Sequence, residues 1–226
     1  HGAAFMNHTE FTGSKSYKDI KNSDIVVVTA GAAQVPGETR LQLLSKNVKI
    51  LKGIVTEVKR HAPQSILMIV TNPVDVLTYF ALKYSRFPHH RVFGTGTVLD
   101  TARFRSYLAR YFGVNAHNVH AYVLGEHGDS SFPALSTANV GSIPLAAMPG
   151  YNEKAMWAIH YTVRTVVYDI IKKKGATNLA IATCVTQLVR AILDDTHGIF
   201  PVSSVLRGEY GIKNVSVSTP SVIGRR

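Results

Sequence analysis

The sequence contains a single cysteine and no long hydrophobic run. Because Cys184 has no partner in the chain, an internal disulfide is excluded, and its apolar neighbours predict a small buried side chain. No apolar stretch approaches the roughly 20 residues of a membrane-spanning helix, no signal-peptide pattern opens the chain, and no histidine or cysteine spacing predicts a metal site. We therefore expect a cytoplasmic protein with no membrane segment and no bound metal.

Acidic residues are also scarce, since 14 Asp and Glu stand against 25 Lys and Arg, which gives a formal net charge of +11. A basic chain is compatible with a nucleic acid or another polyanion as its partner. The basic residues are spread along the chain, however, and the densest cluster, Lys172–Lys174, lies at the expected end of a helix, where cations suit the helix dipole. A solvated basic surface is the favoured interpretation, and no nucleic-acid partner is predicted.

The first part of the chain alternates buried strands with helices. Asp24–Ala30 and Ser65–Thr71 are continuous apolar runs, which favour strands of a parallel sheet that is covered on both faces. Between them, apolar residues recur at spacings of three and four from Leu41 to Val58 and predict an amphipathic helix. A further helix over Val74–Tyr84 and a short strand over Arg91–Gly94 complete the pattern. Residues 1–95 are therefore predicted to form part of an open α/β sheet.

The pattern changes after residue 95, and residues 96–226 are predicted to form a second domain of α+β character. The expected helices are Leu99–Phe112, Asn152–Lys174 and Asn178–Leu193, and the expected strands are Val119–Leu124 and Ser136–Val140. The last stretch, Gly198–Val222, is predicted to alternate short strands with glycine-rich turns.

One stretch of the second part, Val123–Asp129, carries a histidine between two glycines. A histidine titrates near neutral pH, and neighbours without side chains leave its ring open to a substrate, so His127 is a candidate general acid or base. The alternative is a solvated turn at the end of a strand. Upstream, Asp100 and Arg103 share one face of a helix. They are either an exposed ion pair, or a partner that orients His127 and a cation that holds a substrate carboxylate, and spacing does not choose between these.

Two loops follow strands of the predicted sheet, at the edge where open α/β sheets bind ligands. The loop Gly31–Glu38 combines small residues with Arg40 just beyond its far end, so it can close over a ligand, or it is a plain connection. Asn72 follows the next strand, and its amide can hold a substrate oxygen or cap the next helix.

Together these segments resemble the L-lactate and malate dehydrogenase family over essentially the whole chain. The resemblance implies a Rossmann-type parallel sheet, incomplete here, that binds NAD, followed by a catalytic domain. It also implies transfer of a hydride between nicotinamide and C2 of a 2-oxo or 2-hydroxy acid. The matching stretches are Val28–Ala32, Pro36–Arg40, Thr71–Asp75, Gly94–Arg103, Gly125–Asp129 and Lys174–Thr177.

The resemblance assigns a role to each candidate. His127 would donate a proton to the carbonyl of pyruvate and accept one from lactate, with Asp100 as its orienting partner. Arg103 would anchor the substrate carboxylate, and Arg40 would polarise the reacting carbonyl as the loop excludes water. Asn72, after which a cis peptide bond to Pro73 is implied, would bind the same oxygen. The remaining implied contacts are Thr177 beside the substrate and Gly31, Ala32, Val70, Asn72 and Thr95 at the dinucleotide.

Gln34 decides the expected substrate, because relatives that act on oxaloacetate carry arginine at its position. A neutral amide does not balance a buried second carboxylate, so pyruvate, reduced to L-lactate, is expected. The runner-up is a dehydrogenase of malate or another 2-hydroxy acid. Two further alternatives are a non-catalytic, basic anion-binding protein on the same fold and an inactive relative that only assembles with intact subunits.

Arg105 and His120 match positions at which bacterial members of the family bind fructose 1,6-bisphosphate between subunits. A cation and a titratable imidazole suit a phosphate, and a homotetramer with this effector is expected, with polar surface residues as the alternative.

The sequence departs from the family pattern at Ala33, at Asn178 and at both ends of the chain. The first strand, the glycine-rich turn, the acid that binds the adenosine ribose and the final helix have no counterpart in these 226 residues. The expectation of NAD instead of NADP therefore rests on the resemblance alone. We expect these residues by themselves to aggregate and to be nearly inactive.

Overall fold

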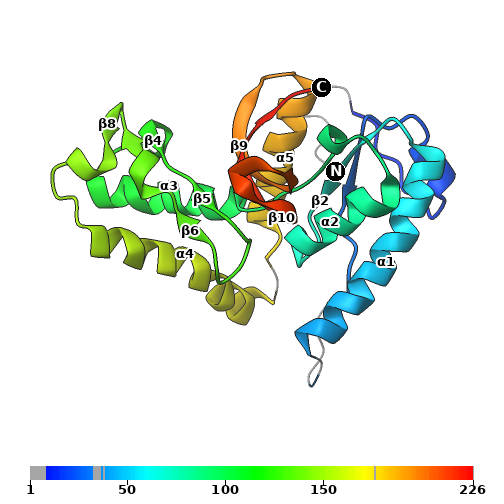
Figure 1. Ribbon diagram of the computed structural model, residues 1–226, viewed down its shortest axis with the longest axis horizontal. Helices are drawn as coiled ribbons and strands as arrows, with labels where there is room; N and C mark the ends of the chain where they lie inside the picture. Colours follow the sequence, from blue (N-terminus) through cyan, green and yellow to red (C-terminus); the bar gives the residue numbers. More distant parts are fainter. Residues whose placement is uncertain (1–8, 33–36, 38, 176, 226) are drawn as a thin grey trace.

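The computed structural model describes residues 9–32, 37, 39–175 and 177–225, which fold into a layered α/β part and a second lobe (Figure 1). The helices of four residues or more are the short 3₁₀ helix η2 (Tyr17–Ile20) and the α-helices α1 (Arg40–His61), α2 (Val74–Ser85), α3 (Val98–Phe112), α4 (Glu153–Lys174) and α5 (Leu179–Leu193). The strands are β1 (Ile25–Val28), β2 (Ile66–Ile69), β3 (Val92–Gly94), β4 (Val119–His120), β5 (Val123–Leu124), β6 (Phe132–Pro133), β7 (Asn139–Val140), β8 (Ile143–Pro144), β9 (Gly198–Arg207) and β10 (Lys213–Ile223).

The main sheet has the strand order β1-β2-β3-β9-β10. β1, β2 and β3 run parallel, with Val26 opposite Leu67 and Met68 opposite Phe93, as the continuous apolar runs predict. Helices α1 and α2 connect these strands, and each lies where the spacing of apolar residues predicts a helix. The predicted α/β architecture of the first part of the chain is confirmed.

The prediction for the C-terminal stretch is wrong. Instead of several short strands, this stretch forms the two long antiparallel strands β9 and β10. Their pairing runs from Gly198 opposite Ile223 to Arg207 opposite Lys213. β9 also joins the parallel strands, with Gly94 opposite Ser203. Buried serines explain the error: Ser203 is fully buried and Ser216 nearly so, and these polar residues make a continuous buried strand resemble broken ones. The predicted strands Val119–Leu124 and Ser136–Val140 are likewise shorter, and Ser136 lies in a 3₁₀ turn.

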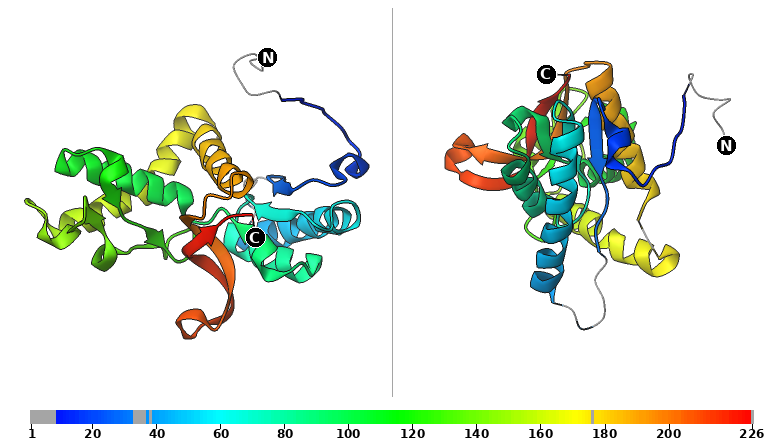
Figure 2. Two further views of the ribbon diagram at one scale, coloured as in Figure 1. Left: turned by 90° about the horizontal axis from the view of Figure 1, so that it is seen from above. Right: turned by 90° about the vertical axis from the view of Figure 1, so that its right-hand side faces the viewer.

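Alternate residues of β2, an internal strand of the sheet, pack against different helices. Leu67 and Ile69 pack into the cluster formed with α1 and α2, whereas Met68 packs with α5. Helices therefore cover both faces of the sheet (Figure 2). Cys184 of α5 belongs to the second of these clusters, and burial raises the pKa of its thiol to about 11, so the predicted buried cysteine is confirmed.

A third apolar cluster forms the core of the other lobe, between α3, α4 and the short strands β4, β5 and β7. Helix α3 begins directly after β3, and its buried Phe104 and Leu108 belong to this cluster. It also contacts β9 of the main sheet, so one helix belongs to the lobe and reaches the sheet (Figure 1). None of the described helices is both long and apolar enough to cross a lipid bilayer.

Candidate active site

His127 and Asp100 meet directly. The Nδ1–H of His127 donates to Oδ2 of Asp100 over 2.6 Å, and the side chains are 30% and 11% exposed. Asp100 lies in the first turn of α3, whereas His127 lies in the loop after β5, so residues 27 positions apart form one couple. Because Nδ1 is engaged, Nε2 is the ring nitrogen left for a proton transfer. The interpretation of Asp100 as an orienting partner is supported over that of a plain surface ion pair.

The charges around the ring determine its protonation. Burial lowers the pKa of His127, but the hydrogen bond and charge of Asp100, aided by the charge of Asp75, outweigh it, so the net pKa is raised. The positive charge of Arg103, three residues after Asp100 on α3, acts in the opposite direction. No hydrogen bond or ion pair of Arg103 is found within the described residues, so this half-buried cation is available to an anionic ligand.

The loop that carries His127 is fixed at its start by backbone contacts. Gly125 exchanges two backbone hydrogen bonds with Ser218 of β10, at 3.0 and 2.8 Å, and its φ of +90° favours a glycine. Just before it, the backbone N–H of Val123 donates to the Thr101 hydroxyl over 2.9 Å. Helix α3 therefore carries Asp100 and also holds the strand that leads to its partner. At the far end of the loop, Arg164 of α4 pairs with Asp129 at 3.1 Å.

Asp75, in the first turn of α2, was not predicted as a site residue. Asp75 is 6% exposed, and its carboxylate accepts the backbone N–H of His127 at 2.7 Å and the hydroxyl of Ser203 at 2.5 Å. Burial raises the pKa of Asp75, although the hydrogen bonds from Ser203 and His127 lower it in part. A carboxylate inside the otherwise apolar start of α2 was the available signal.

Asn47 was also missed, and it joins the ends of two strands. Asn47 is 2% exposed, and its side chain accepts the N–H of Ala32 at 2.7 Å and donates to the backbone oxygen of Asn72 at 3.1 Å. The sequence feature that indicates its burial is its position three residues after Leu44, on the apolar face of α1. The Asn72–Pro73 bond is cis, as expected. The Asn72 side chain accepts the N–H of Val74 at 3.3 Å, which supports its capping role while leaving it exposed at the sheet edge.

The strand ends form a surface that suits a dinucleotide. Gly31 is exposed, and a Cβ atom there would collide with the Thr71 side chain, so the backbone itself is presented at this edge. Val70 is half-buried, whereas Thr95 is 3% exposed and its N–H donates to the backbone oxygen of Ile69 at 2.9 Å. Thr95 is thus less accessible than Gly31 and Val70 at this edge.

The remaining predicted residues are less closely tied to the couple. Thr177 is half-buried beside α5, Arg40 is the first residue of α1, and Gln34 and Ala33 lie outside the described residues. Arg105 on α3 donates to the backbone oxygen of Ala116 at 3.4 Å, close in sequence to the exposed His120 on β4.

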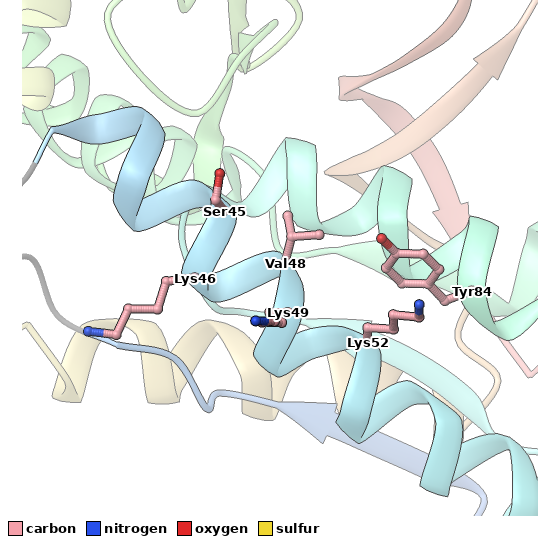
Figure 3. Close-up of a pocket in the computed structure, with 6 residues that line it drawn as sticks. All are labelled: Ser45, Lys46, Val48, Lys49, Lys52 and Tyr84. Atoms are coloured by element: carbon pink, nitrogen blue, oxygen red, sulfur yellow. The ribbon is translucent and has the colours of Figure 1, made fainter.

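A separate hollow of about 490 Å³ lies on the outer side of α1 and α2 (Figure 3). Lysines 46, 49 and 52 line it, and Lys52 lies 5.7 Å from the centre of the Tyr84 ring. It contains no carboxylate or histidine and none of the predicted site residues, so we place the chemistry at His127. The described part of the chain contains no cluster of histidine, cysteine and acidic residues that could hold a metal.

Two family models match the chain. The NAD binding domain of lactate/malate dehydrogenase matches residues 1–94, and the alpha/beta C-terminal domain of the same family matches residues 97–226. Among curated relatives, L-lactate dehydrogenase 1 of Clostridium acetobutylicum is 46% identical over 99% of this chain and 73% of its own length. L-lactate dehydrogenase of Bacillus licheniformis is 46% identical over 100% of this chain and 72% of its own length.

Solved structures agree with this match. A lactate dehydrogenase from a Medee basin deep-sea metagenome library is 39% identical with a TM-score of 0.93, over 99% of this chain and 73% of the other. The minor L-lactate dehydrogenase of Enterococcus mundtii, in a ligand-bound form, is 37% identical with the same TM-score of 0.93 and the same coverage.

Proposed function

Since the chain belongs to the lactate/malate dehydrogenase family, we propose that it reduces pyruvate to L-lactate with NADH and catalyses the reverse reaction. The observation that carries the proposal is the His127–Asp100 couple, at 2.6 Å, together with Arg103, a cation for which the described part of the chain provides no ionic partner. The two curated relatives described above are both named L-lactate dehydrogenases. Bound NADH would supply the hydride.

The side chains of this protein would supply the proton and hold the substrate. Arg103 would bind the carboxylate of pyruvate, and the protonated Nε2 of His127 would donate to the carbonyl oxygen as negative charge develops there. Asp100 fixes the ring through Nδ1 and stabilises its positive form. We assign Arg40 and Asn72 to the same oxygen and Thr177 to the edge of the substrate. We assign contacts with NAD to Gly31, Ala32, Val70 and Asn72, and we place the more buried Thr95 beneath these residues.

The test is the loss of NADH absorbance on addition of pyruvate. It is measured on the 226 residues alone and on the full-length protein, meaning a chain that also contains the first strand and the glycine-rich turn of the family. Turnover in the full-length protein supports the proposal. Absence of turnover in a folded full-length protein favours an inactive relative, or an anion-binding protein whose affinity for DNA would fall steeply with salt.

The choice of pyruvate over oxaloacetate is tested at Gln34. Gln34→Arg is expected to raise the kcat/KM ratio of oxaloacetate to pyruvate about 10- to 100-fold, because a charge-assisted hydrogen bond contributes about 1.5–3 kcal/mol. The matched control is Gln64→Arg, which adds the same charge at an exposed position after α1. An unchanged ratio in the Gln34 variant would assign substrate choice to other residues and favour another 2-hydroxy acid.

We further propose a homotetramer activated by fructose 1,6-bisphosphate, bound by Arg105 and His120. Helix α3 contacts β4, so the two residues come from neighbouring elements, and the exposed aromatic residues of α4 (Trp157, Tyr161 and Tyr168) offer surface to another subunit. A cytoplasmic role in fermentation is proposed because pyruvate reduction reoxidises NADH.

Activation is expected as increased turnover at low pyruvate when the sugar bisphosphate is added to the wild type. Arg105→Ala combined with His120→Ala should abolish the increase, whereas Arg110→Ala, which removes an exposed cation of the same helix, should keep it. An undiminished response in the double variant would rule out this site.

A further inference from the structure

The buried carboxylate of Asp75 joins parts of the chain that are far apart in sequence. Asp75 lies in the first turn of α2, 52 positions before His127 and 128 positions before Ser203. One oxygen accepts the backbone N–H of His127 at 2.7 Å, and the other accepts the hydroxyl of Ser203 at 2.5 Å. Ser203 is itself 2.9 Å from the hydroxyl of Ser216 on β10. The histidine loop and β9 therefore both bind one carboxylate of α2, and β10 is linked to it through Ser203.

Close packing around two glycines makes this convergence possible. A Cβ atom on Gly94 would collide with the Thr78 side chain and would lie 3.3 Å from the Cβ of Ser203. On Gly96 it would lie 2.6 Å from the backbone nitrogen of Ser203. Since these glycines let β9 approach α2, Ser203 can reach Asp75.

We propose that Asp75 is a positioning residue for His127, holding the backbone of the proton-donating histidine and placing a second carboxylate beside its ring. This inference rests on the function proposed above. It adds the residue that fixes the position of His127 with respect to the other site residues. Asn72 and Pro73 lie between β2 and α2, and Asp75 follows them as the second residue of α2. The same short segment thus reaches the sheet edge through Asn72 and the histidine loop through Asp75.

The charges near the imidazole come from several elements. Asp100 and Arg103 of α3 and Asp75 of α2 all act on His127, and the two carboxylates favour its charged form. On its own loop, Glu126 acts on Asp75. From α4, His160 is affected by the charge of Asp100, and burial followed by the charge of Arg164 lowers the pKa of His160.

A purely structural anchor does not need the charge that Asp75 carries. Burial raises its pKa, so the folded state holds this proton more tightly than the unfolded chain does, and stability decreases as the pH rises above the unfolded value near 3.8. An asparagine can accept the His127 N–H and donate to Ser203, which keeps both hydrogen bonds without the buried charge. If Asp75 serves the reaction, Asp75→Asn should therefore stabilise the fold and impair His127.

The experiment compares Asp75→Asn and Asp75→Ala with Glu126→Gln in the full-length protein. Glu126→Gln is the matched control, because it also removes one negative charge near His127, from an exposed side chain that does not touch the His127 N–H. The measurements are the NMR titration of the His127 ring, the pH profile of pyruvate reduction and the thermal midpoint.

Asp75→Asn is expected to lower the pKa of His127, to reduce kcat about tenfold on the alkaline side of the profile and to raise the thermal midpoint at neutral pH. Asp75→Ala also frees the backbone N–H of His127, so kcat should fall about 100-fold at all pH values. Glu126→Gln should move the titration much less, because water screens its charge.

Three outcomes would overturn the proposal: a His127 titration in Asp75→Asn equal to that of wild type, a shift no larger than that of Glu126→Gln, or loss of the folded state in Asp75→Asn. The NMR titration needs no substrate. If the wild type does not reduce pyruvate, the proposed function fails, while a displaced titration in Asp75→Asn still supports Asp75 as the residue that positions His127.

Discussion

His127→Asn is expected to lower kcat for pyruvate reduction by about 10²–10⁴-fold, the range that a positioned acid or base contributes. Asparagine carries no transferable proton near neutral pH, yet its amide nitrogen can take the place of Nδ1 and donate to Asp100. The packing of the loop should therefore survive the substitution. The rate is measured as NADH consumption with saturating pyruvate.

Two controls separate lost chemistry from lost structure. His117→Asn changes an exposed histidine after α3 and should leave the rate unchanged. Quenching of protein fluorescence by NADH should persist in His127→Asn, because the strand ends proposed to hold the cofactor are intact. A His127→Asn variant that kept more than a tenth of the wild-type rate would show that another group donates the proton.

The raised pKa of His127 also gives the direction of the pH dependence. Pyruvate reduction uses the protonated ring, so its rate should be constant below the raised pKa and decrease above it, while lactate oxidation should show the opposite trend. The same group links pH to stability. The contribution of the charged ring to stability is fully present below the unfolded value of 6.5 and is lost as the pH rises through the higher folded value. His127→Asn should remove both dependences.

The sequence alone predicts the elements of the fold that apolar patterns define. β2 and α1 lie where a continuous run and a period of three to four residues place them. The stretch that forms β9 was predicted as shorter strands, because the pairing of β9 depends on partners remote in sequence and because Ser203 looks like an interruption until its hydrogen bonds are seen. Hydrophobic pattern identifies which segments are buried, but it does not say which polar side chains are buried with them.

The candidate site shows the same division. The pair of Asp100 and His127 follows from residue type and resemblance, and its 2.6 Å contact needs the folded loop. Asp75 and Asn47 hold strand ends and the histidine loop in place. Each is a polar residue on an apolar stretch of a helix, which indicates burial but does not identify the partner that it binds. Groups that touch a substrate belong to recognisable motifs, whereas the groups that position them depend on tertiary contacts.

Asp100→Asn provides the sharpest comparison with Asp75→Asn, because both replace a carboxylate that acts on His127 by its amide. Asp100 contacts the ring at Nδ1, while Asp75 contacts the backbone. An amide that donates to Nδ1 would place the remaining ring proton on Nε2 in a neutral imidazole, and the charge that favours the imidazolium would be absent. We therefore expect kcat for pyruvate reduction to fall by about 10²–10⁴-fold.

The pH profile distinguishes the two roles. In Asp100→Asn the loss should persist at acid pH, because the orientation of the ring is disturbed as well as its proton affinity. In Asp75→Asn the rate should recover at acid pH, where the ring is protonated in any case and its backbone N–H is still bound. KM for pyruvate should change less than kcat in both variants, since Arg103 remains in place. Recovery of Asp100→Asn at acid pH to the wild-type rate would mean that Asp100 contributes charge alone, and that the orientation of His127 comes from its backbone anchor.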